Sequence, residues 1–117
     1  MRRRDWSLRL EDILDAIARI QRYCESISFE EFRRDTKTVD AVVRNLEVIG
    51  EAARHIPATL ERQHPEVPWS KMRGMRHVLA HEYFGIDSAI LWQTVKNDLP
   101  PLLPLIQKVL SQKEQGG

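Results

Sequence analysis

The sequence predicts an all-α protein, an up-and-down bundle of four main helices with short extra helical turns. Three observations carry this prediction. Apolar residues recur three and four positions apart over long segments, no segment alternates as a half-buried strand does, and 5 glycines with 6 prolines are few for a turn-rich β-sandwich. With 117 residues, of which 42% are hydrophobic, we expect one domain over residues 1–117.

The first expected helix runs from Trp6 to Cys24, because its apolar residues form one stripe and its charged residues lie on the opposite face. Ser28 and Glu31 then have the spacing of a capping box, which predicts a short helical turn. The polar stretch 33–37 is expected to be a loop.

A second long helix is expected to begin at Thr36 or Thr38 as N-cap and to end at Pro57. Irregular chain with one turn around 59–63 leads to Pro68, which suits the first position of a third helix because proline needs no N–H there. Gly85 is expected to stop that third helix.

A fourth helix is expected to be capped by Asp87 or Ser88. The prolines at 100, 101 and 104 must kink or restart it before the apolar segment 105–110. The polar tail 112–117 is expected to be frayed.

The formal net charge of +1 does not indicate nucleic-acid binding by the whole surface. An RNA site would have to be a local patch, either the arginines at 2–4 or the region of Arg73 and Arg76. A single cysteine, Cys24, excludes an internal disulfide and suits a reducing cytosol. The charged N-terminus and the lack of a long apolar run predict a cytoplasmic protein without signal peptide or membrane span.

Polar residues are dense in the segment 71–85, at the end of the third helix. At ~100° per residue, Arg76 and Tyr83 lie nearly in line two turns apart, whereas His81 lies ~140° around from Arg76. For Arg76 and His81 to act together, the helix must loosen near Gly85 or a second copy must complete the site. A symmetric dimer would do this, so the sequence predicts a homodimer.

These residue types suit phosphodiester cleavage without a metal or other cofactor. Histidine takes and returns protons near neutral pH, as His81 would, and the fork of Arg76 matches phosphate oxygens. Tyr83 would stack on a base or hold a phosphate oxygen. His77, Arg73 and Glu82 are possible auxiliary residues.

Other interpretations stay open from spacing alone. Arg76 and His81 could provide surface charge or helix capping, and Tyr83 could be a packed aromatic that seals the helix end. His77 and His81 have a spacing that suits a metal, but no third ligand lies near in register, and Glu82 faces another direction. We therefore predict no metal site.

Arg76, His81 and Tyr83 form the pattern Arg-x4-His-x-Tyr, which resembles the signature of HepT-like ribonuclease toxins in the HEPN superfamily. The segment Asp40-Ala41-Val42-Val43-Arg44-Asn45-Leu46-Glu47-Val48-Ile49-Gly50-Glu51-Ala52-Ala53 looks like the second long helix of that family, and Asp98-Leu99-Pro100 is typical of its final helix. The resemblance covers residues 5–110. One departure is His77, where many HEPN ribonucleases carry Asn or Asp after the motif arginine.

The resemblance implies a HEPN-type helical dimer that cleaves RNA without a metal, with Arg76 and His81 as the catalytic residues. It also implies a type VII toxin-antitoxin system, in which a minimal nucleotidyltransferase antitoxin of the MntA type silences the toxin by AMPylation of the motif tyrosine, here Tyr83. Bulky anionic nucleotides there would fill the cleft and repel RNA. No DNA partner is expected.

A second hypothesis is a non-catalytic helical module that binds a nucleotidyltransferase partner or a nucleotide. The motif favours the ribonuclease, whereas the near-neutral charge and His77 leave room for the module. Expression of the wild type and of His81→Ala alone in a host, scored for growth and RNA integrity, would discriminate between the two.

Overall fold

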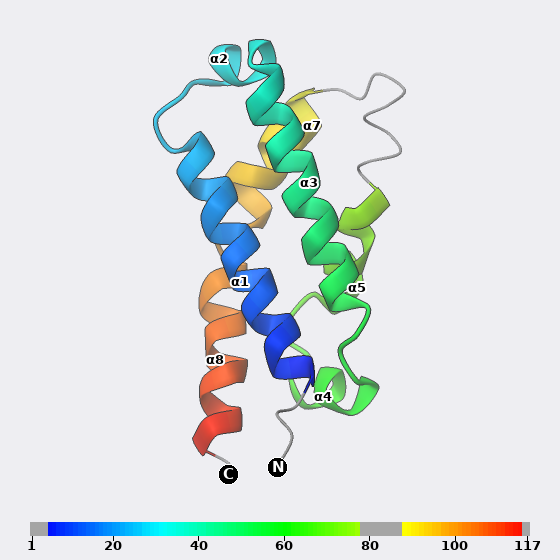
Figure 1. The fold of residues 1–117 in the computed structure, drawn as a ribbon. Helices are drawn as coiled ribbons and strands as arrows, with labels where there is room; N and C mark the ends of the chain where they lie inside the picture. Colours follow the sequence, from blue (N-terminus) through cyan, green and yellow to red (C-terminus); the bar gives the residue numbers. More distant parts are fainter. Residues whose placement is uncertain (1–4, 78–87, 116–117) are drawn as a thin grey trace.

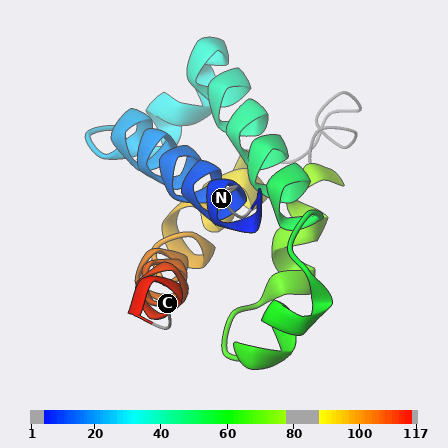
Figure 2. The same cartoon turned by 60° about the horizontal axis from the view of Figure 1, so that its bottom comes forward.

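The computed structural model describes residues 5–77 and 88–115, and within these ranges every regular element is helical. The chain runs up through α1, down through α3, up through α5 and η1, and down again through α7, η2 and α8 (Figure 1). This order confirms the all-α fold and the up-and-down arrangement of four main helical segments. At the end of the molecule where α1 begins, α8 and the α4–α5 segment lie apart (Figure 2).

The first helix, α1, spans Asp5–Cys24 and buries the apolar stripe that the sequence indicates. The expected short turn is α2, Phe29–Arg34. Its capping box is present, because the Ser28 hydroxyl accepts from the Glu31 amide at 3.1 Å and the Glu31 carboxylate accepts from the Ser28 amide at 2.8 Å. Two orphan backbone donors are thereby satisfied.

The long helix α3 spans Thr36–Ala53, and its N-cap is Asp35 rather than Thr36 or Thr38. The Asp35 carboxylate accepts from the Thr38 amide at 3.2 Å and from the Thr38 hydroxyl at 2.7 Å. The amide bond caps the helix, and the hydroxyl bond engages the Thr38 side chain, so that α3 begins directly after Asp35. The expected loop 33–37 is therefore wrong, because only Asp35 separates α2 from α3.

After α3, the expected turn is α4, Ala58–Gln63. The helix α5 spans Trp69–Gly74, and Pro68 is its N-cap, so this helix begins one residue later than expected. The α-helix ends at Gly74, and Met75–His77 form the 3-10 turn η1. The prediction that the third helix continues as an α-helix through Arg76 is therefore wrong. The expected stop at Gly85 lies outside the described residues.

The last segment begins with α7, Ser88–Gln93, and passes through the π-helical turn η2, Thr94–Asp98, to α8, Leu102–Gln115. In η2 the Leu99 amide donates to the Thr94 carbonyl, five residues earlier, at 3.0 Å. Pro100 and Pro101 have no N–H for the preceding turn, so the helix widens, stops and restarts. The restart agrees with the sequence prediction, and α8 runs to Gln115, into the tail expected to fray.

One hydrophobic core joins these elements, and α1, α3, α5 and α8 all contribute to it. The helix α1 packs on α3 and α8, and α3 packs on α5 and η1. The largest fully buried side chains include Leu10, Ile17, Phe32, Ile49, Met72 and Ile106. None of the described helices is long and apolar enough to cross a membrane.

Candidate active site

Arg76 is positioned by a close contact between two backbones. It lies in η1 and packs against Gly50 of α3, where a Cβ on Gly50 would be 2.5 Å from the Arg76 amide nitrogen and 2.8 Å from the Arg76 Cβ. A glycine inside a helix costs stability relative to alanine, and here the missing side chain admits the turn that carries Arg76. The position of Arg76 is therefore set by α3 as well as by its own turn.

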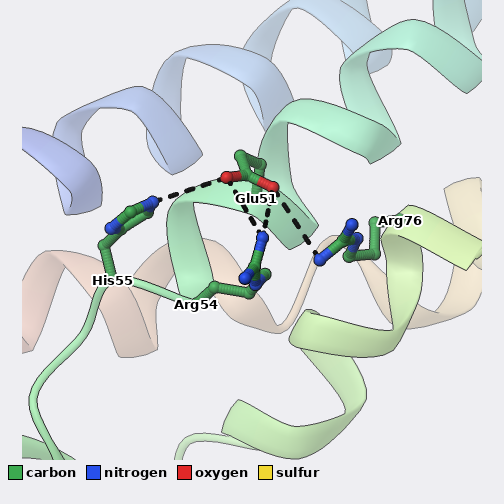
Figure 3. A network of polar contacts seen from close by, with 4 residues as sticks. All are labelled: Glu51, Arg54, His55 and Arg76. Carbon is green, nitrogen blue, oxygen red and sulfur yellow. Dashed lines mark hydrogen bonds and ion pairs between the residues drawn. The ribbon is translucent and has the colours of Figure 1, made fainter.

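The next residue of α3, Glu51, faces Arg76 (Figure 3). The Glu51 Oε1 lies 3.9 Å from Nη1 of Arg76, and the side chain of Arg76 is 39% exposed. Glu51 also accepts from Arg54 at 3.1 Å and lies 3.4 Å from Nε2 of His55. One carboxylate thus contacts three basic side chains.

The hydrogen bond from Arg54 is the main reason why the pKa of Glu51 is lowered from its ordinary value. Desolvation, the second-largest effect, raises the pKa, whereas the hydrogen bond with His55 and the charges of Arg54 and Arg76 lower it further. Hydrogen bonds and positive charges favour the ionised form of a carboxylate, so Glu51 is an anion at neutral pH.

A pocket of about 330 Å³ opens beside Arg76, between α1 and α3. Its lining carries three arginines and three carboxylates and is completed by two apolar residues: Arg9, Asp12, Arg44, Glu47, Val48, Glu51, Ala52 and Arg76. The formal charges of the lining cancel, so the pocket offers individual guanidinium forks rather than a strongly positive field.

Arg73 does not join Arg76. Its Nη1 is paired with the Glu61 carboxylate of α4, which links α5 to the preceding turn. Within the described residues, no contact supports the expectation that Arg73 is an auxiliary residue at the RNA site, because its guanidinium pairs with Glu61 of α4. The arginines at 2–4, the other patch considered for RNA, lie outside the described residues.

The remaining motif residues are placed less fully. The backbone of His77 belongs to η1, but its side chain is not described, and His81, Glu82 and Tyr83 lie outside the described residues. In the part of the chain that the structure describes, no three His, Cys, Asp or Glu side chains gather as a metal site. Arg76 is thus the motif residue whose surroundings are known.

The sequence pattern alone does not single out Glu51, although this residue stands in the segment that resembles the second long helix of the HepT-like proteins. The available signal was the pair Gly50-Glu51, a glycine inside an amphipathic helix followed by an acid. An isolated helical glycine usually has a packing reason, and here that reason is Arg76.

The fold and the site together define a small helical protein with an arginine-centred polar pocket. A family model described as "Ribonuclease HepT-like" matches residues 13–109. The chain therefore belongs to the ribonuclease HepT-like family.

Several curated relatives are similar in sequence to this chain over nearly their whole length. A protein of Thermococcus cleftensis named "Probable ribonuclease HepT" is 49% identical over 100 residues, which cover 86% of this chain and 91% of the relative. A protein of Caldanaerobacter subterraneus, described as a candidate RNase, is 40% identical over 91% of this chain and 94% of its own. A similarly described protein of Methanocaldococcus jannaschii is 38% identical over 97% of this chain and 94% of its own. No solved structure gives a significant match to the chain.

Proposed function

We propose that this protein is the ribonuclease toxin of a type VII toxin-antitoxin system, an endoribonuclease that works without a metal. Arg76 and His81 are its catalytic residues, and an MntA-type nucleotidyltransferase silences it by AMPylation of Tyr83. Family membership and the names of the relatives support an RNA substrate. The observation that carries the proposal is the placement of Arg76, half-exposed beside a polar pocket and braced by α3.

The chemistry needs no group beyond the RNA and these side chains. His81 accepts the proton of a ribose 2′-hydroxyl, and the oxygen attacks the adjacent phosphorus. The bond to the 5′-oxygen breaks, and that oxygen takes the proton back from His81 as it leaves, so a 2′,3′-cyclic phosphate forms and His81 is neutral again. Arg76 stabilises the charge that builds on the phosphate oxygens, because its guanidinium donates to two oxygens at once.

The test is expression of the wild type and of His81→Ala in a host without the antitoxin. We expect the wild type to arrest growth and fragment RNA, and His81→Ala to do neither while it remains folded by circular dichroism. General acid–base catalysis contributes roughly a hundred- to ten-thousand-fold in rate, so the loss should be evident. Equal RNA cleavage by a folded His81→Ala protein would contradict the proposal and favour the non-catalytic module that binds a nucleotidyltransferase or a nucleotide.

A further inference from the structure

We propose that Glu51 is a positioning residue of this ribonuclease site, which holds the guanidinium of Arg76 in the orientation that receives the scissile phosphate. The inference rests on the proposed function and adds a residue outside the Arg-x4-His-x-Tyr motif. It begins from the contact between two elements: Glu51 is in α3, whereas Arg76 is in η1.

The arrangement of α3 makes this contact specific to Glu51. Gly50 lets η1 approach to backbone contact, and the following residue then places its carboxylate beside the arginine of that turn. Both residues also line the pocket between α1 and α3. The carboxylate of Glu51 therefore lies where it can orient the guanidinium of Arg76 toward the pocket.

Arg54 and His55 explain how a carboxylate is tolerated next to a site for a phosphate. An unpaired anion there would repel the substrate, but Arg54 lies 3.1 Å and His55 3.4 Å from the Glu51 oxygens. The positive charge of Arg54 offsets that of Glu51, and His55 is a second polar neighbour of the carboxylate. The same carboxylate also faces a third partner, Arg76 (Figure 3).

The contact with Arg76 is loose enough to leave the arginine functional. One guanidinium nitrogen lies 3.9 Å from one carboxylate oxygen, and arginine has five N–H donors. Among the described residues, the ion pair with Glu51 engages one nitrogen of this guanidinium and leaves the others available for phosphate oxygens. Because both side chains are about half-exposed, the pair contributes little to stability, and its effect is on the orientation of Arg76.

A purely local ion cluster is the competing explanation, and the chain contains a matched control for it. Glu30 in α2 pairs with Arg33 at 3.2 Å and with Arg34 at 3.8 Å, three and four residues later. Glu51 pairs with Arg54 and His55 at the same two spacings. What Glu51 has in addition is Arg76.

The experiment compares Glu51→Gln with Glu30→Gln in the full chain, because both remove one negative charge from a similar local cluster. For Glu51→Gln we expect kcat for RNA cleavage to fall about fivefold at unchanged KM, the scale of an exposed ion pair and less than the roughly hundred-fold or greater cost of deleting a transition-state donor. Glu30→Gln should match the wild type, and both variants should keep its melting temperature. Equal effects of the two substitutions, or a change in KM alone, would overturn the proposal.

A second measurement follows Arg76 itself and does not depend on cleavage. The Nε–H order parameter of Arg76, measured by ¹⁵N relaxation, should fall in Glu51→Gln and stay unchanged in Glu30→Gln. An unchanged order parameter in Glu51→Gln overturns the positioning role. If the wild type does not cleave RNA, the proposed function fails, and this measurement still decides whether Glu51 orients Arg76.

Discussion

Gly50 and Arg76 meet backbone to backbone: a Cβ on Gly50 would lie 2.5 Å from the Arg76 amide nitrogen and 3.1 Å from the Arg73 carbonyl oxygen. The first of these distances is too short for a Cβ and a main-chain atom that cannot turn away, and the second is tight. The glycine is therefore required by the neighbouring turn, and the motif arginine depends on a residue in another helix.

Gly50→Ala should destabilise the protein and displace Arg76. Alanine gains about 1 kcal/mol over glycine inside a helix, but overpacking against a fixed backbone typically costs roughly 1–3 kcal/mol, and the cost should dominate. We expect a lower free energy of unfolding in urea and a loss of RNA cleavage larger than the loss of folded protein explains.

Gly74→Ala is the matched control for this change. Gly74 ends α5, and a Cβ there would meet nothing within 4 Å. Its free energy of unfolding should be unchanged or higher by up to about 1 kcal/mol. If Gly50→Ala behaves like Gly74→Ala in both stability and cleavage, the close packing of η1 on α3 does not govern Arg76.

The helices could be predicted because their signals are local. The stripe of α1, the capping box at Ser28 and the restart after Pro101 depend on residues within a few positions of one another. The N-cap of α3 was missed because Asp35, Thr36 and Thr38 are all good caps, and the choice depends on Asp35 binding Thr38 twice.

The site was less predictable because it joins distant segments. The sequence identified Arg76 by its motif, but Glu51 becomes its neighbour only once η1 packs on α3. The homodimer was predicted from the angle between Arg76 and His81 on an ideal α-helix. That geometry does not apply, because the α-helix ends at Gly74 and Arg76 lies in a 3-10 turn. The homodimer itself stays a prediction.

Arg76→Lys should impair cleavage although it preserves the charge. A lysine offers a point charge, whereas the guanidinium presents a planar fork to two phosphate oxygens. We expect kcat/KM to fall by roughly ten- to a hundred-fold, with the melting temperature unchanged because the side chain is 39% exposed. Arg33→Lys on α2 is the control. Equal losses of kcat/KM in the two variants would contradict the assignment of Arg76 as a catalytic residue.

The N-cap of α3 should make stability depend on acid pH. The hydrogen bond from the Thr38 hydroxyl is the main cause that lowers the pKa of Asp35, and the Thr38 amide adds to it. A carboxyl whose pKa is lower in the folded state contributes stability above its unfolded pKa of ~3.9 and loses it as pH falls through the folded pKa. The stability difference between wild type and Asp35→Asn should therefore shrink below about pH 4.

Ser28→Ala provides the comparison for that pH series. The Ser28 hydroxyl caps α2 without carrying a charge, so its removal should cost about 1 kcal/mol at every pH at which the protein is folded. Urea unfolding from pH 7 to pH 3 measures both variants. An Asp35→Asn deficit that stays constant over this range would show that the charge of Asp35 does not contribute.

The family resemblance predicts a homodimer in which two copies share one cleft. The contact should bury on the order of 1,200 Å² or more, since specific interfaces rarely bury less. Light scattering at micromolar concentration should give twice the 13.7 kDa mass of the chain. A monomer that retains full cleavage activity at that concentration would contradict the prediction.

Tyr83 is expected to be the point at which the antitoxin acts. An AMP group adds a phosphate and a bulky nucleoside, which would occupy the cleft and repel the RNA backbone. After co-expression with an MntA-type nucleotidyltransferase, intact-mass measurement should show AMP-sized additions to the wild type and none to Tyr83→Phe. Tyr83→Phe should stay folded and toxic in the presence of the partner, and Tyr23→Phe, at an exposed position of α1, should behave as the wild type. Additions that persist in Tyr83→Phe would show that another residue is modified. The absence of additions in the wild type would show that the antitoxin inhibits by binding instead.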